Sequence, residues 1–95
     1  MASVIITPTA QHDLAELIRT HSLPASTRER VQHSIEPLRD FPLLGARLEG
    51  RWSRFRFVLG PWRWMIVVYL YEEAIDRVAI VTIQDARAAR SPTNV

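Results

Sequence analysis

The chain has 95 residues, so we expect a single domain over residues 1–95 with a polar tail from about residue 88. It contains no cysteine, which excludes disulfides and thiolate metal sites, and we expect neither a metal nor a small-molecule cofactor. The longest apolar stretch, residues 65–71, is far shorter than the roughly 20 residues of a membrane span. We therefore expect a cytoplasmic protein that makes no membrane contact.

The positive charge of the chain has an unusual source. All 12 basic residues are arginine, none is lysine, and the formal net charge is +2. Arginine stays protonated at working pH and binds phosphate through a planar fork of donors, so arginines on one face would suit nucleic acid. Codon bias would explain the same composition with no functional meaning. Several arginines crowd the middle of the chain, where acidic residues are scarce: Arg47, Arg51, Arg54, Arg56 and Arg63.

The first half of the chain predicts a strand followed by two helices. Residues 3–7 are short and rich in β-branched side chains, which favours a strand. Thr7 stands in an N-cap position before a proline, and apolar residues then recur at helical spacing as far as about His21. A second amphipathic helix is predicted over 26–39, where Pro37 should distort the last turn. Together they form an αα-hairpin, and each helix has an apolar stripe that needs a partner surface.

The second half of the chain predicts three strands. After a connector at 40–50 that is punctuated by proline and glycine, the hydrophobic period changes from helical to alternating. The alternating stretches cover 54–59, 62–71 and 77–84, and short turns separate them. Such connections give a three-stranded antiparallel meander. The fold class is therefore α+β, with an N-terminal strand, an αα-hairpin packed on one side of the sheet, and the meander.

Strand alternation also predicts which face of the sheet meets the helices. The more apolar face carries Phe55, Phe57, Trp62, Trp64, Ile66 and Val68. We expect it to pack against Leu14, Leu17, Val31 and Ile35. The opposite face would then present Arg54, Arg56 and Arg63. On this basis the two strand tryptophans are core residues rather than stacking platforms for nucleic acid bases.

The order of these features resembles that of a known family. After the helical hairpin come "FP", "GARLEG", "FRFVLGPWRWMIVVY" with its Gly-x-x-Arg, and a last strand that ends in "TIQDAR". This set, which covers about residues 3–90, resembles the RelE/ParE superfamily of bacterial type II toxins. The resemblance implies a RelE/ParE-like fold and a cognate antitoxin. It also implies one of two activities, which are cleavage of mRNA in the ribosomal A site in the RelE-like branch and inhibition of DNA gyrase in the ParE-like branch.

The resemblance also implies site residues. Arg63 matches the arginine of Gly-x-x-Arg, which contacts the scissile phosphate in the nuclease branch. Arg56 matches a basic position on the preceding strand, and Arg87 matches the arginine at the end of the last strand. We predict that these three residues are catalytic. Further RNA or phosphate contacts are predicted at Arg51, Arg54 and Arg90.

Two departures from the nuclease pattern concern proton transfer. Val58 stands where the nuclease has a second lysine, and residues 88–95 hold neither the tyrosine nor the histidine that nuclease members place there. RNA cleavage through the 2′-hydroxyl needs a base, and arginine, with a pKa above about 12, is a poor one. Asp85 is the one nearby proton acceptor, although a turn aspartate that caps its own backbone is the more common interpretation. The three histidines lie in or beside the helical hairpin and are interpreted as surface residues.

Three hypotheses for function follow. The first is a toxin that cleaves mRNA on the ribosome, with Arg56, Arg63 and Arg87 holding phosphate. The second is a non-enzymatic ParE-like inhibitor of DNA gyrase, for which missing acid and base groups are no defect. The third is a toxin relic that only binds its antitoxin. The sequence leaves the first two nearly level.

Overall fold

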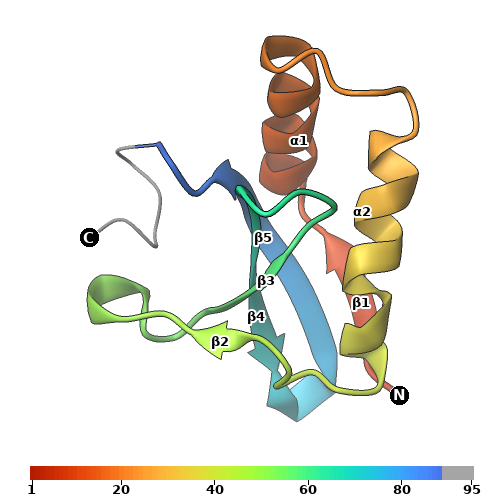
Figure 1. Ribbon diagram of the computed structural model, residues 1–95. Helices are drawn as coiled ribbons and strands as arrows, with labels where there is room; N and C mark the ends of the chain where they lie inside the picture. Colours follow the sequence, from red (N-terminus) through yellow and green to blue (C-terminus); the bar gives the residue numbers. More distant parts are fainter. Residues whose placement is uncertain (89–95) are drawn as a thin grey trace.

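The protein folds around one mixed sheet flanked by two helices (Figure 1). The computed structural model describes residues 1–88, so Arg90 and most of the predicted polar tail lie outside the described residues. The principal elements are β1 (Ser3–Ile6), α1 (Pro8–Thr20), α2 (Thr27–Ile35), β2 (Ala46–Arg47), β3 (Arg56–Leu59), β4 (Met65–Glu72) and β5 (Arg77–Asp85). Short 3-10 helices cover Glu36–Arg39, Gly50–Trp52 and Glu73–Ile75. Across residues 1–88, every helix is too short or too polar to span a bilayer.

The sheet contains five strands in the order β1-β5-β4-β3-β2. The predicted antiparallel meander is confirmed as β3, β4 and β5. The N-terminal strand β1 pairs with β5 in parallel, so it closes one edge of the sheet. At the other edge, the two residues of β2 pair with β3, a strand that the sequence did not predict because it is so short. The α+β class and its order of elements are confirmed.

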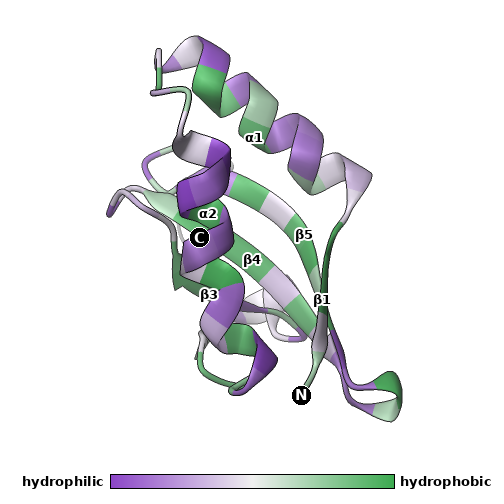
Figure 2. Cartoon of the chain, turned by 90° about the vertical axis from the view of Figure 1, so that its right-hand side faces the viewer, coloured by the Kyte–Doolittle hydropathy of each residue, from purple (hydrophilic) through white to green (hydrophobic). Residues whose placement is uncertain are grey.

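The first helix of the hairpin begins and ends where local signals predict. The Thr7 hydroxyl accepts a hydrogen bond from the Ala10 N–H at 3.3 Å, and α1 ends at Thr20 with His21 as its C-cap. Helix α2 is shorter than predicted, because the chain changes to a 3-10 turn at the segment that contains Pro37. Both helices lie on the same side of the sheet (Figures 1 and 2).

The main hydrophobic core lies between this hairpin and the sheet. It gathers apolar residues of both helices with Met65, Val67 and Tyr69 of β4 and Val78, Ile80 and Ile83 of β5. Tyr69 is fully buried, and its phenol oxygen accepts a hydrogen bond from the Gly45 N–H at 2.9 Å. Burial raises the pKa of this phenol above its ordinary value. The tyrosine therefore ties the loop before β2 to the core.

The predicted assignment of sheet faces is wrong for most of its residues. Phe55, Phe57, Ile66 and Val68 lie on the face away from the helices, in a second cluster with Leu48. The physical reason is that β4 opens with five consecutive buried residues, so both of its faces are apolar and alternation cannot tell inside from outside. Trp62 and Trp64 precede β4, and they pack against the helix-side core from the turn, as predicted for these two residues.

Candidate functional site

The three predicted catalytic arginines are not gathered at one place. Arg63 is exposed in the turn between β3 and β4, and Arg87 follows β5. These two share one end of the sheet, because the first residue of β4 pairs with Asp85. Arg56 instead pairs with Tyr69, four residues farther along β4. At about 3.3 Å per residue this places Arg56 roughly 13 Å from that end.

The predicted shared face of Arg54, Arg56 and Arg63 is therefore wrong. Opposed residues of an antiparallel pair point to the same side, so Arg56 lies on the helix side together with Tyr69. Arg54 precedes β3, and Arg63 precedes β4, so the alternation of a strand governs neither of them. For Arg54 and Arg63 the error arises because the strands begin later than predicted, and for Arg56 it follows from the inverted faces.

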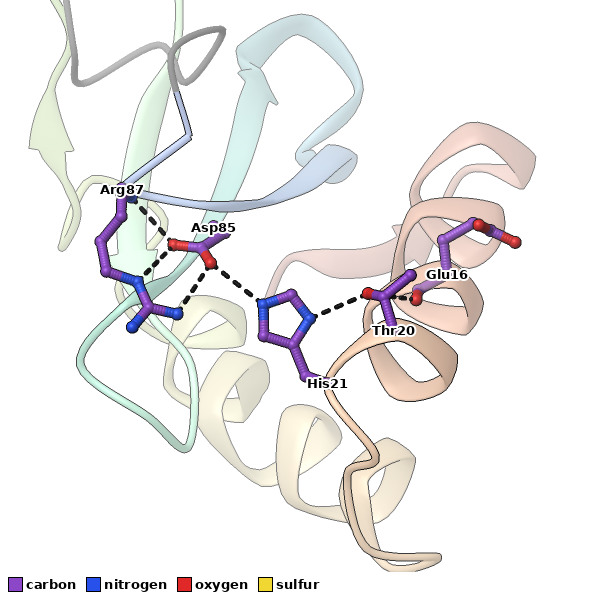
Figure 3. Close-up of polar contacts among 5 residues, drawn as sticks. All are labelled: Glu16, Thr20, His21, Asp85 and Arg87. Carbon is purple, nitrogen blue, oxygen red and sulfur yellow. Dashed lines mark hydrogen bonds and ion pairs between the residues drawn. The ribbon is translucent and has the colours of Figure 1, made fainter.

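A compact polar cluster lies at the end of the sheet that carries Arg87 (Figure 3). The Arg87 guanidinium donates two hydrogen bonds to the Asp85 carboxylate, from Nε at 2.9 Å and from Nη2 at 2.8 Å. The Arg87 backbone N–H donates a third at 2.9 Å, which is the turn-capping role considered for this aspartate. The other carboxylate contact is His21, whose Nε2 lies 3.1 Å from Asp85 Oδ2.

The charge of Asp85 is fixed by these partners. The hydrogen bond from Arg87 is the main cause that holds the pKa of Asp85 well below its ordinary range, and the bond from His21 acts in the same direction. Burial acts to raise this pKa, because the Asp85 side chain is only 15% exposed, but its effect is smaller than that of the hydrogen bonds. Asp85 is therefore a permanent carboxylate near neutral pH. It can orient a cation or an imidazole, but it is a poor proton acceptor.

His21 has hydrogen-bond partners on both ring nitrogens. Its Nδ1 lies 2.9 Å from the Thr20 hydroxyl oxygen, and that hydroxyl lies 2.8 Å from the backbone carbonyl of Glu16 (Figure 3). When the Thr20 proton points to Glu16, Nδ1 must donate, and because Nε2 also donates to the Asp85 carboxylate, the ring is then an imidazolium. When the hydroxyl turns to Nδ1, the ring is neutral, and Nε2–H still donates to Asp85. Both protonation states of His21 thus have partners in this site, which suits a group that transfers protons.

Two tryptophans hold the cluster in place. The His21 ring stacks on Trp64 with centroids 4.7 Å apart and planes at 14°, and the Arg87 guanidinium lies 5.1 Å from the same ring. Trp62 stacks on Trp64 at 6.1 Å, and Arg30 of α2 lies 5.8 Å from Trp62. The rings are therefore already covered by protein groups, which agrees with their prediction as structural residues rather than base-stacking platforms.

His21 lies beside Asp85 because helix α1, whose C-cap is His21, is hydrogen-bonded to β5. Asp13 accepts hydrogen bonds from the Thr82 hydroxyl and, at 3.4 Å, from the Ile83 N–H. His21 and Thr20 were not predicted as site residues, because 64 residues separate His21 from Asp85. The position of His21 at the end of the first helix could be predicted from the sequence, but its contact with Asp85 could not.

Within the described part of the chain, no group of three His, Asp or Glu residues could hold a metal ion.

A second group of arginines lies at the other end of the sheet. Arg47, Arg54 and Arg56 line a hollow of about 230 Å³ together with Leu43, Tyr71 and Glu73. Arg56 Nη1 donates to the carbonyl oxygens of Leu43 at 3.3 Å and Gly45 at 2.9 Å, and Arg47 Nε donates to a backbone carbonyl. Among residues 1–88, none of the three arginines forms an ion pair.

Arg51, another predicted RNA contact, is not among the residues that line this hollow. Arg51 is exposed in the Gly50–Trp52 turn, where its guanidinium lies 5.9 Å from the Trp52 ring. The predicted role of Arg51, like those of Arg54 and Arg90, stays a prediction.

Solved structures with a similar fold were found. One chain of the toxin–antitoxin complex RelBE2 from Mycobacterium tuberculosis superposes with a TM-score of 0.65 at 21% identity, over 88% of this chain and 96% of that chain. The protein has a RelE-like fold. A conserved hypothetical protein from Helicobacter pylori shares this RelE-like fold with a TM-score of 0.56 at 20% identity, over 87% and 92% of the two chains. No protein-family model and no curated protein matches the sequence.

Proposed function

We propose that this protein is the toxin of a type II toxin–antitoxin system and that it blocks translation by cleaving mRNA on the ribosome. The RelE-like fold, shared with a chain of a toxin–antitoxin complex, supports the toxin assignment. The observation that carries the nuclease assignment is the contact of His21 with Asp85 beside Arg87. It supplies the proton-transfer group that strand residues and the tail lack. A toxin with a ribosomal target would act in the cytoplasm, which is therefore the proposed location.

In this proposal Arg87 binds the scissile phosphate. Its Nε and Nη2 are occupied by Asp85, so its Nη1 can donate to a non-bridging oxygen, and the side chain is 65% exposed. Charge builds on those oxygens as the phosphorane forms, and a donor that is already oriented stabilises it without reorganisation. Arg63, exposed at the same end of the sheet, is proposed to bind a neighbouring phosphate.

His21 acts as the general base. Asp85 holds the ring through Nε2, and the Thr20 hydroxyl, at Nδ1, occupies the place that the RNA 2′-hydroxyl would take. Nδ1 accepts the proton of the 2′-hydroxyl while its oxygen attacks phosphorus. The bond from phosphorus to the 5′ oxygen breaks, and that oxygen takes a proton from water. The products are a 2′,3′-cyclic phosphate and a free 5′-hydroxyl.

Inhibition of DNA gyrase is the second candidate. The roughly 13 Å between Arg56 and the Arg87 end favours it, because one nuclease centre would not use all three predicted arginines. A non-enzymatic inhibitor needs only an interaction surface, and charges spread along a sheet suit that task. The third hypothesis, a relic that only binds antitoxin, predicts no growth arrest at all.

One induction experiment separates these candidates. The protein is expressed from a tight promoter, and translation rate, mRNA 5′ ends and plasmid supercoiling are measured in the same culture. The nuclease proposal predicts a fall in translation with new mRNA ends, while supercoiling is preserved. Loss of supercoiling with intact mRNA would identify a gyrase inhibitor and reject the nuclease.

A further inference from the structure

We propose that the loop 41–44, together with Arg47, Arg54 and Arg56, is a docking surface for an antitoxin segment that carries apolar side chains next to carboxylates. We call these residues the apolar–basic surface. The inference rests on the proposed toxin function, since it names where the partner of that toxin binds. It lies at the opposite end of the sheet from His21 and Arg87.

The apolar half of this surface is unusually open. Phe41 is 64% exposed, and Leu43 and Leu44 are each 58% exposed. These residues border a hollow of about 590 Å³ that Tyr71 and Glu73 also line. Large apolar side chains scattered singly over a surface are ordinary, but a contiguous set of them indicates a binding surface.

The loop is also held in shape without a partner. The Leu44 N–H donates to the Phe41 carbonyl at 3.0 Å, and the Phe41 N–H donates to the Pro37 carbonyl at 2.9 Å. At its far end, Gly45 is fixed by the buried Tyr69 hydroxyl. Because its backbone is already ordered, this loop loses less conformational entropy when a partner binds there.

The basic half adjoins the apolar half directly. The hollow beside the loop and the hollow among the arginines share Leu43, Tyr71 and Glu73, so the two form one continuous surface. Three guanidinium groups face one lining carboxylate, and none of the three is in an ion pair within residues 1–88. Arg47 and Arg56 are oriented by backbone carbonyls, which leaves other N–H donors available. A carboxylate-bearing segment complements this charge.

The apolar half decides between a protein partner and RNA. A phosphate backbone would use the arginines but would leave Phe41, Leu43 and Leu44 in water. A peptide that places apolar side chains on the loop and carboxylates on the arginines satisfies both halves. Central apolar residues inside a polar rim are also the usual arrangement of specific protein interfaces.

The test uses the intact chain and the product of the gene adjacent to its own, mixed as purified proteins in a titration calorimeter. Phe41→Ser combined with Leu44→Ser should raise the dissociation constant by about 30-fold or more, because hot-spot side chains are removed. Arg47→Glu should raise it by about tenfold, with a smaller effect at high salt. Two matched controls, Leu59→Ser and Arg28→Glu, change an exposed leucine and an exposed arginine elsewhere and should leave it unchanged.

The outcomes separate the docking surface from the toxin assignment. If the wild-type chain does not bind the adjacent product, the toxin proposal fails, and the docking proposal fails with it. If the wild-type chain binds and the surface variants bind equally well, only the docking proposal is overturned. Circular dichroism shows whether each variant is folded. If the serine variants do not fold, Arg47→Glu still tests the surface.

Two further measurements test other occupants. A 12-nucleotide single-stranded RNA is titrated into the same variants. If Arg47→Glu weakens RNA binding and leaves binding of the adjacent gene's product unchanged, the surface binds nucleic acid and the docking proposal is overturned. Light scattering of the wild-type chain tests a second copy as the occupant. A homodimer that Phe41→Ser dissociates would overturn the antitoxin proposal in favour of self-association.

Discussion

At one end of the sheet Arg87 is paired with Asp85 and lies against Trp64, whereas at the other end Arg47 and Arg56 border a hollow with no carboxylate partner of their own within residues 1–88. The paired arginine has a fixed position before any substrate arrives, which is what stabilisation of a transition state requires. The unpaired arginines keep their full attraction for an anion, which suits recognition of a partner. Arginine thus has two different roles in this protein, and whether a carboxylate is paired with it determines which role it has.

Among the arginines, the largest expected effect is at the paired end. Arg87→Ala should lower the rate of mRNA cleavage by about 100- to 1,000-fold, because one oriented donor to the phosphorane is lost. Arg87→Lys, which keeps the charge but loses the fork, should retain part of the activity. Arg56→Ala, at the other end of the sheet, should lower the cleavage rate less than Arg87→Ala does. The rates are compared in a purified translation system with Arg28→Ala as the control, and an Arg56→Ala loss as large as that of Arg87→Ala would contradict the division between the two ends.

Gly45→Ala should disrupt the other end. A Cβ there would lie 2.6 Å from the Phe57 carbonyl oxygen and 2.8 Å from the Tyr69 hydroxyl oxygen, so the buried tyrosine bond would be strained or lost. We expect a loss of about 2 to 3 kcal/mol in the free energy of unfolding. Gly50→Ala is the matched control, because Gly50 has a φ of +62° but a Cβ added there would meet nothing within 4 Å, and it should lose only about 1 kcal/mol. Urea denaturation measures both, and equal losses would show that crowding at Gly45 is unimportant.

The pairing of Asp85 predicts how stability depends on pH. The pKa of its carboxyl is lower in the folded protein than in the unfolded chain, where it is about 3.9. Its stabilisation is therefore complete above the unfolded value and is lost as pH falls through the folded value. Relative to Asp85→Asn, the wild type should be about 1 to 2 kcal/mol more stable at pH 6. Denaturation from pH 6 to pH 2 should show this difference shrinking with acid, and a constant difference would contradict the ion pair.

The smallest stability effect is expected at Arg63. Its side chain is exposed in a turn and makes no hydrogen bond or ion pair with residues 1–88, so Arg63→Ala should change the free energy of unfolding by no more than about 0.5 kcal/mol. Cleavage should nevertheless fall if it binds a phosphate beside Arg87. Thermal melting and the cleavage assay together separate the two effects. A wild-type cleavage rate in this variant would remove Arg63 from the site.

Local signals in the sequence predicted much of the fold. Thr7 marks the start of α1, Pro37 marks the end of regular α2, and short turns separate the strands of the meander, since each of these features depends on a few adjacent residues. The face of β4 was not predictable in this way, because buried side chains occupy both faces from Met65 to Tyr69. The two-residue β2 is too short to have a periodic pattern.

The candidate site was predictable only in part. Arg87 and Asp85 are two residues apart, so their turn could be anticipated from the sequence. The contact between His21 and Asp85 depends on how α1 packs against β5, and no local pattern records that packing. The separation of Arg56 from Arg63 likewise follows from where β4 begins, which is set by tertiary burial.

The role of His21 as general base is tested by single-turnover cleavage of mRNA on programmed ribosomes, with the wild type, His21→Ala and His33→Ala compared. His33 is an exposed histidine of α2, and it serves as the matched control. We expect His21→Ala to stay folded and to cleave about 100- to 10,000-fold more slowly, because a general base is lost. His33→Ala should cleave at the wild-type rate. Cleavage by folded His21→Ala at the wild-type rate would show that His21 is not the general base.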